Sequence, residues 1–436
     1  MPEVSIILPT YNRVDVIGRA VASVILQTHD DWELIVVDDG STDGTVERLQ
    51  GLDPRLRIVR QANQGVYAAR NAGLAAAGGR YITFLDSDDE WLPHFLALTT
   101  AFLRAHPDAH WVTTEFHEDL GDGSRPILHD HHDIAAVYCG FARSIRSNAL
   151  DLPQGLKDDY LRVYARKRMV GDWGRDTLDA IGLSEAFIYD GDIHRHMRWG
   201  YLNWLPVTVL TRHALDVVGP FTTHTRSAAD YRFLARLARH FPAHMIAIPS
   251  AIKYERAAGN QTLAQGHLAT GAGAYRFEVN KLAFFDELYA GPGCTDAETL
   301  LLRRHYCLAV GHRALGLGHR AEAIRYLRQA AAWRPMLWRG WLMLALAQAV
   351  PGDRAAATVY SRYLRGYDVL RRLATGRLTP GRLIGKVVRR LGGRGGGAAT
   401  SADEDAAGGQ TVTDTALSAL DDTRAAPAPR VAARRA

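Results

Sequence analysis

Acidic side chains follow two apolar segments near the amino terminus, at the point where each segment ends. Asp39 comes after one such segment, and Asp86 and Asp88 come after the segment 81–85. Much later, Asp230 opens an amphipathic stretch. An open α/β sheet places its ligand site at the carboxyl ends of its buried strands, so we expect these carboxylates to line one site. Carboxylates repel a phosphate-bearing ligand unless a divalent cation lies between them, so the pattern indicates a metal-bound nucleotide.

Asp86 and Asp88 have the spacing of a metal-binding pair. At alternate positions of a strand end their carboxylates would point to the same side. Hard oxygen ligands of this kind suit Mg²⁺ or Mn²⁺, which would also bind diphosphate oxygens. An Asp-x-Asp pair is common by itself, but the apolar strand before it and Trp91 after it strengthen the metal interpretation.

Three further side chains have the chemistry to bind a nucleotide. Tyr11 follows the first apolar run, where its ring could stack on a nucleobase. Asp39 could accept the imide N–H of a uracil-like base, which favours UDP or dTDP over GDP; the alternative is that it caps its own turn. Arg70 could reach the base or the phosphates with its guanidinium, and the alternative is a surface ion pair.

The elements that must position these residues alternate between short apolar runs and helical patterns. This alternation is typical of parallel βαβ units, so an α/β fold with a mostly parallel sheet is predicted. The predicted strands of this region are 4–9, 34–37, 56–59, 81–85 and 111–116.

The rest of the chain is less regular. Residues 117–200 lose the alternation and are predicted to form a mostly helical insertion, with an Arg/Lys-rich helix near 161–169. A His/Asp cluster at 129–133 is interpreted as a polar loop, because adjacent loop residues seldom converge on one metal ion. Within 266–350 the apolar spacing resembles one tetratricopeptide-type helical pair, which must pack on neighbouring helices.

Composition limits the classes of protein. With 436 residues, 47% hydrophobic and 23% charged, the chain is expected to be globular with two or three domains. Its three cysteines share no close spacing, so neither a disulfide framework nor a zinc site is predicted. The chain starts directly with a predicted strand, so we expect no signal peptide and a cytoplasmic location.

The stretch 362–394 is strongly basic and alternates arginine pairs with aliphatic residues. Such a segment could lie on the anionic inner face of a membrane, and the alternative is a solvated face in a poorly ordered tail. Nucleic acid is not a predicted partner, because no aromatic residues interleave with these arginines.

Taken together, the motifs resemble those of the family 2 glycosyltransferases of the GT-A fold. The segments that carry this resemblance are 4–13, 38–45, 63–73 and 84–91. It covers about residues 1–116 and, less closely, 204–262. It implies an inverting enzyme that moves a sugar from a nucleotide diphosphosugar to an acceptor hydroxyl.

The resemblance also implies roles for single residues. Those expected to bind the donor nucleotide are Thr10, Tyr11, Asp39, Arg70 and Asp86. Asp88, with Asp86, would hold the cation. Asp230 would be the catalytic base, and the alternative is that it only caps its helix. The chain departs from the family at Ala229, where a glutamate is usual, and at 256–260, where a histidine is often found.

The implied domains are a nucleotide-sugar-binding half at 1–116, the insertion at 117–200, an acceptor-side half at 201–265, the helical region at 266–350, and a basic segment with a disordered tail at 351–436. The implied acceptor is a cell-envelope glycan or its lipid-linked precursor.

Two other functions remain open. Ala229 and Ala257 would suit an inactive scaffold protein, whereas the aspartates argue against it. A sugar nucleotidyltransferase would need a Gly-rich basic loop after the first strand, which residues 10–13 do not provide.

Overall fold

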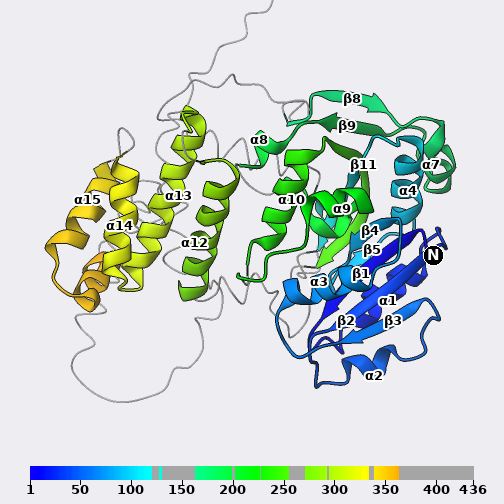
Figure 1. Ribbon diagram of the computed structural model, residues 1–436, viewed down its shortest axis with the longest axis horizontal. Helices are drawn as coiled ribbons and strands as arrows, with labels where there is room; N and C mark the ends of the chain where they lie inside the picture. The colour runs from blue at the N-terminus through cyan, green and yellow to red at the C-terminus, as the bar shows by residue number, and fades with distance from the viewer. Residues whose placement is uncertain are drawn as a thin grey trace, which may run out of the picture. The chain divides into compact units, whose positions relative to one another are not determined.

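The computed structural model describes residues 1–119, 127–129, 163–198, 202–225, 227–254, 271–291, 294–332 and 338–362. The chain divides into two compact units. The first contains a mixed β-sheet and its helices, and the second contains helices from the carboxyl-terminal part (Figure 1).

The amino-terminal part of the sheet is parallel. Its strands lie in the order β3-β2-β1-β4, with the bounds β1 Val4–Thr10, β2 Trp32–Asp38, β3 Leu56–Arg60 and β4 Tyr81–Phe84. The connecting helices are α1 Ile17–Ile25, α2 Thr45–Leu49 and α3 Val66–Ala76. Every residue of β1 and β4 is buried, as expected of strands covered on both faces. The predicted α/β fold is therefore confirmed.

Side chains alternate between the two faces of this parallel part. Ile6, Leu8, Leu34 and Val36 pack with α1 and with α4, Phe95–Ala105. Ile35 and Val37 point to the other face, towards Ala69 of α3. The helices therefore sandwich the sheet (Figure 1).

Helix α3 approaches the sheet closely through Gly73. A Cβ at this position would lie 2.4 Å from Ile7 Cγ2 and 3.2 Å from Val37 Cγ2. Only glycine allows this separation, so residue 73 sets how near α3 lies to β1 and β2.

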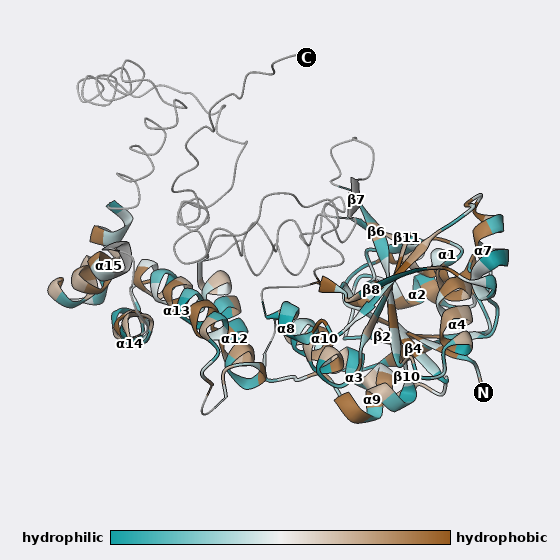
Figure 2. Ribbon diagram, turned by 90° about the horizontal axis from the view of Figure 1, so that it is seen from above, coloured by the Kyte–Doolittle hydropathy of each residue, from teal (hydrophilic) through white to brown (hydrophobic). Residues whose placement is uncertain are grey.

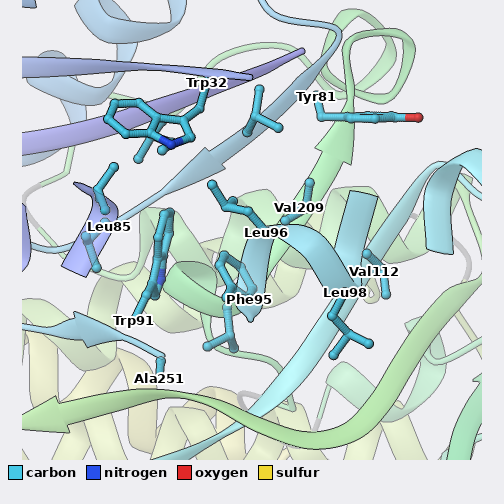
Figure 3. Packing of buried hydrophobic residues seen from close by; sticks show 14 of the residues in the cluster. Trp32, Tyr81, Leu85, Trp91, Phe95, Leu96, Leu98, Val112, Val209 and Ala251 are labelled. Carbon is cyan, nitrogen blue, oxygen red and sulfur yellow. The ribbon is translucent and has the colours of Figure 1, made fainter. Parts of the chain in front are cut away.

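The core on the α1 side is built around aromatic residues (Figure 3). Trp91, in β5 (Glu90–Trp91), packs against Phe95 with ring centroids 4.6 Å apart. Its Nε1 donates a hydrogen bond to Pro206 O at 2.8 Å, so the one polar atom of the buried ring is satisfied.

Beyond β4 the sheet continues in the order β10-β6-β11-β9-β8, with β5 on β11 and β7 on β6. The strand bounds are β6 Trp111–Asp119, β7 Ile127–His129, β8 Arg166–Met169, β9 Phe187–Gly191, β10 Thr208–Thr211 and β11 Ala243–Tyr254. Helical elements of this part are η1 Asp172–Gly174, α7 Arg175–Ala180, α8 His194–Met197, η2 Leu205–Val207, α9 Arg212–Val218 and α10 Ala229–His240.

The predicted mostly helical insertion needs a correction where it is described. Residues 163–198 contain short helices, but β8 and β9 extend the main sheet, and β9 pairs with β11. The helix predicted near 161–169 is wrong at its carboxyl end, which forms β8. Pairing with distant residues, not local propensity, decides the structure here.

A buried ion cluster fastens these strands. Asp190 of β9 accepts hydrogen bonds from Arg168 Nε at 2.7 Å and is bonded to His244 Nδ1 at 2.5 Å. Burial favours the neutral acid, but the bonds from His244 and Arg168 outweigh it and lower the pKa of Asp190 to about 2. Asp190 therefore joins β8, β9 and β11 as a carboxylate.

Both outer strands of the sheet carry cationic side chains. Strand β3 bears Arg57 and Arg60, and β8 bears Arg166, Lys167 and Arg168. Four of these five residues are exposed, and Arg168 is half-buried.

The second unit is helical. Its helices are α13 Ala297–Gly316, α14 Arg320–Ala331, α15 Trp338–Ala349 and the first part of α12, Gly271–Leu288. Helices α13 and α14 form the predicted pair, with a Cβ at Gly311 falling 2.8 Å from Leu327 Cγ. Figure 2 shows hydrophilic and hydrophobic residues on both helices.

No helix that the structure describes has the length and hydropathy to cross a membrane. Most of the basic stretch 362–394 lies outside the described residues.

Candidate functional site

The predicted nucleotide residues meet at one edge of the sheet. Strand β1 lies between β2 and β4, with Thr10 opposite Asp38 and Ile7 opposite Phe84. Asp39 N donates to Thr10 O at 2.8 Å. Neighbouring strands lie about 4.8 Å apart, so the turns after β2, β1 and β4 are within reach of one small ligand.

Tyr11 and Thr10 differ in exposure. Tyr11 is 47% exposed, so its ring is available for stacking. Thr10 is buried, and its Oγ1 has no hydrogen-bond partner among the described residues. This hydroxyl has an unused donor, but the atom is covered, so the side chain would have to rotate before it could bind a polar ligand atom.

The loop after β1 is braced by the loop after β2. Asn12 N donates to Ser41 Oγ, and Thr42 N donates to Asn12 Oδ1, both at 2.9 Å. Arg13 N donates to Thr45 Oγ1 at 2.9 Å. Asn12 has a φ of 51°, in the left-handed region that asparagine tolerates better than most residues. These contacts hold the backbone on both sides of Tyr11.

Asp39 binds a third loop and does not cap its own turn. Its Oδ1 accepts from Gln61 Nε2 at 2.7 Å and Gln64 N at 2.9 Å, and its Oδ2 accepts from Gly65 N at 2.8 Å. The capping role belongs to Asp38, whose Oδ1 accepts from Ser41 N. A carboxylate has about four acceptor positions, so these three bonds leave one on Oδ2.

Asp86 and Asp88 lie in a turn and not on a strand end. Strand β4 stops at Phe84, and Asp89 N donates to Asp86 O at 3.2 Å to close the turn. The predicted alternation along a strand is therefore wrong, because the chain has already left the sheet. Asp89, to which the sequence assigned no role, is buried in this turn and accepts from Tyr254 N at 3.1 Å.

The turn concentrates negative charge. Burial and the neighbouring Asp86 raise the pKa of Asp88, against the opposing charges of Arg13 and Arg19. Burial and the charges of Asp88 and Asp86 raise the pKa of Asp89 well above its usual range. A group of carboxylates that repel one another in this way would be stabilised by a cation.

The residues of the turn fit a divalent cation that is held mainly by the phosphate oxygens of a bound nucleotide and by water. Among the described residues, no three His, Cys, Asp or Glu side chains form a complete metal site. Mg²⁺ commonly takes one or two protein carboxylates and completes its shell with phosphate oxygens and water. Asp88, with the second oxygen of Asp86, can supply that share.

Arg70 is a buried residue and not part of a surface ion pair. It is 5% exposed, and its Nη2 donates to Asp86 Oδ1 at 2.6 Å. Burial would lower its pKa, but the charges of Asp86 and Asp230 raise it above the usual value. Its Nε is buried without a hydrogen-bond partner among the described residues.

Asp230 contacts α3, the helix that carries Arg70. Asp230 lies in the first turn of α10, and its Oδ1 accepts from Tyr67 Oη at 3.3 Å and from Tyr231 N at 3.0 Å. The helix cap is Ala228, with a φ of 62° and no side-chain capping bond. Asp230 is therefore not the N-cap residue, but its bond from Tyr231 N satisfies one first-turn N–H of α10, so the capping alternative stays open.

An amide clamp holds the chain before α10 against α3. Asn71 Nδ2 donates to Phe221 O at 2.8 Å, and Phe221 N donates to Asn71 Oδ1 at 2.9 Å. The ring of Phe221 stacks on Phe233 of α10 with centroids 4.3 Å apart.

The sequence analysis did not predict a role for Tyr67, Asn71 or Phe221. The available signal was the spacing of 67, 70 and 71, which puts their side chains on one face of a helix.

Of the two positions at which the sequence departs from the family pattern, the structure describes one. Ala229 is buried in the first turn of α10, beside Asp230. Residues 256–260 and most of the His/Asp cluster 129–133 lie outside the described residues.

Comparison with known proteins finds a match to the sequence model of one protein family. The sequence model described as Glycosyl transferase family 2 matches residues 5–153. An uncharacterised glycosyltransferase of Nostoc is 46% identical over 126 residues, which are 28% of this chain and 38% of that protein. The Escherichia coli UDP-Glc:alpha-D-GlcNAc-diphosphoundecaprenol beta-1,3-glucosyltransferase is 40% identical over 102 residues, 23% of this chain and 40% of that protein.

The chain thus matches less than half the length of these curated relatives. A solved structure, TarS 1–349 of S. aureus in complex with UDP-GlcNAc, aligns over 84% of this chain and 92% of its own, with 17% identity and a TM-score of 0.47.

Proposed function

We propose that the chain is an inverting glycosyltransferase, because residues 5–153 match the sequence model described as Glycosyl transferase family 2. Its substrates are a nucleotide diphosphosugar and an acceptor hydroxyl. The single observation that best supports this is the arrangement on α3, where Arg70 contacts Asp86 and Tyr67 contacts Asp230. A donor-side and an acceptor-side carboxylate are thereby linked through one helix.

Asp230 is the general base in this proposal. Its carboxylate takes the proton of the acceptor hydroxyl as that oxygen attacks the anomeric carbon. The bond from this carbon to the diphosphate breaks on the opposite side, so the configuration inverts in one displacement. The nucleoside diphosphate leaves with the bonding electrons, and no covalent enzyme intermediate forms.

The donor side holds the leaving group. Asp88, with Asp86, would hold Mg²⁺ or Mn²⁺, which when bound would stabilise the negative charge of the diphosphate. Arg13 and Arg19 lie close enough to affect the pKa of Asp88, so they add positive charge near the same turn. Thr10 and Tyr11 would contact the nucleoside.

The base of the donor is a pyrimidine with an imide N–H, hence UDP or dTDP. Asp39 has one acceptor position left on Oδ2, which can take that N–H. Cytosine has no hydrogen at N3 and offers no such donor there. The E. coli relative, whose name specifies UDP-Glc, is consistent with this choice.

The acceptor is a cell-envelope glycan or its lipid-linked precursor. The diphosphoundecaprenol in the name of the E. coli relative supports a lipid-linked acceptor. An enzyme acting on such a substrate would work in the cytoplasm at the inner membrane face, held there by the basic stretch 362–394. Unchanged membrane association after removal of residues 360–436 would contradict this tether.

The test is a product assay. UDP-, dTDP-, GDP- and CMP-sugars are incubated with the protein, Mn²⁺ and a lipid-linked acceptor, and released UDP and pyrophosphate are measured separately. Glycosyl transfer releases UDP or dTDP and elongates the acceptor. In a parallel reaction supplied with UTP and a sugar 1-phosphate, release of pyrophosphate would indicate a nucleotidyltransferase instead. Tight nucleotide binding without any product would favour the scaffold alternative.

A further inference from the structure

We propose that Tyr67 is a positioning residue, whose hydroxyl holds the carboxylate of Asp230 in the orientation that receives the acceptor's proton. The inference rests on the proposed function, since it takes Asp230 as the base. Tyr67 itself keeps its proton and does not react.

The contact joins two elements far apart in the chain. Tyr67 Oη, near the start of α3, donates to Asp230 Oδ1 at 3.3 Å across a sequence separation of 163 residues. Asp230 Oδ1 also accepts a hydrogen bond from Tyr231 N at 3.0 Å. Two donors from different directions restrict rotation of the carboxylate. The separation is long for an O–H···O bond, as is common for catalytic hydrogen bonds before the substrate binds.

Tyr67 is well suited to orient another side chain because it is itself held firmly. It is 7% exposed, and its ring stacks on Phe221 with centroids 6.1 Å apart and planes 19° apart. Phe221 in turn stacks on Phe233 of α10. Arg70 Cζ lies 5.7 Å from the centre of the Tyr67 ring. The hydroxyl therefore reaches Asp230 from a fixed place.

The hydroxyl is also a permanent donor. Burial and the negative charge of Asp230 raise the pKa of Tyr67 far above its usual range, although Arg70 acts in the opposite direction. The phenol therefore stays protonated at any working pH.

The start of α10 depends on such contacts from outside the helix. Its cap, Ala228, is in the left-handed region and makes no side-chain capping bond. A non-glycine residue in this conformation persists only when its surroundings enforce it. The Asn71 clamp on Phe221 holds the chain before the helix, and Tyr67 holds the functional carboxylate within the first turn.

The test compares Tyr67→Phe with a matched variant, Tyr164→Phe. Tyr164 is 1% exposed, and its hydroxyl accepts a hydrogen bond from Asn203 Nδ2 at 3.3 Å, the same length as the bond from Tyr67 to Asp230. Both changes remove one buried hydroxyl and keep the ring. For Tyr67→Phe we expect kcat to fall about ten- to hundredfold, the effect of losing a hydrogen bond to a charged group, with the donor KM within about twofold of the wild type. Tyr164→Phe should keep kcat within about threefold.

Calorimetric titration with UDP shows that each variant is folded and binds nucleotide. An unchanged kcat in Tyr67→Phe, or equal losses in the two variants, would overturn the positioning role while leaving the proposed function intact. A wild-type protein that binds UDP but transfers no sugar in the panel would overturn the proposed function, and this inference with it.

Discussion

Arg70 Nη2 donates to Asp86 Oδ1 at 2.6 Å, so a buried guanidinium on α3 is bonded directly to the acidic turn after β4. The turn holds three aspartates, two of which, Asp88 and Asp89, have raised pKa values. Arg70 offsets part of this charge from inside the protein, together with Arg13 and Arg19. A bound divalent ion would act from the ligand side.

Replacing Arg70 with leucine should destabilise the protein. Asp86 would lose its partner, at a cost of about 2 kcal/mol. This is below the usual cost of breaking a fully buried pair, because the Asp86 side chain is 30% exposed and water replaces part of the interaction. Urea denaturation measures the change. Arg325→Leu is the control, since it removes a pair with Glu322 in which both side chains are exposed and should cost less than about 1 kcal/mol. Equal losses in the two variants would contradict the role of Arg70.

Asp230→Asn should reduce turnover by about a thousandfold or more and leave UDP binding unchanged. Asparagine keeps the shape and can still accept from Tyr67, but it cannot take a proton from the acceptor hydroxyl. Steady-state kinetics and titration with UDP measure the two properties. Near-normal transfer by this variant would exclude Asp230 as the base.

Asp88→Asn should stabilise the metal-free protein at pH 7 while removing its response to metal. A raised pKa means that Asp88 contributes stability below its ordinary pKa of 3.8, and that this contribution is lost as pH rises through the folded value. At pH 7 the ionised side chain is therefore a net cost, and its removal should raise Tm by about 2 °C.

Scanning fluorimetry with EDTA or Mn²⁺ tests both halves of that prediction. With UDP present, Mn²⁺ should raise the Tm of the wild type by mass action and leave Asp88→Asn unchanged. If Asp88→Asn has a lower Tm than the wild type in EDTA, the repulsion among the aspartates of this turn does not limit the stability of the protein.

Asp39→Asn should weaken UDP binding about tenfold or more and narrow the preference for UDP over CDP. The new amide presents N–H groups where a base donor should bind, and one of them must face a donor from Gln61, Gln64 or Gly65. The same amide could donate to the unprotonated N3 of cytosine. Calorimetric titration with both nucleotides gives the ratio, and an unchanged ratio would exclude Asp39 as the base-reading residue.

The sequence allowed prediction of the residues whose position follows from strand order. Asp39, Asp86 and Asp88 follow the carboxyl ends of β2 and β4, which flank β1, so parallel pairing brings them to one edge. Tyr67 and Phe221 could not be found in this way, because their partners are more than a hundred residues distant and meet only through tertiary packing. Strands β8 and β9 were missed for the same reason, since β9 pairs with β11 about fifty residues later.

The cationic outer strands bear on whether copies of the protein aggregate. Exposed strand edges have unpaired backbone groups that can recruit a neighbouring chain. Among the described strands both ends of the sheet, β3 and β8, are rich in arginine or lysine. Three of these five cations pair with a carboxylate of their own molecule, but the crowding of long, charged side chains at one edge still opposes the joining of two copies through it. The long sheet is thus protected against growing from one molecule into the next.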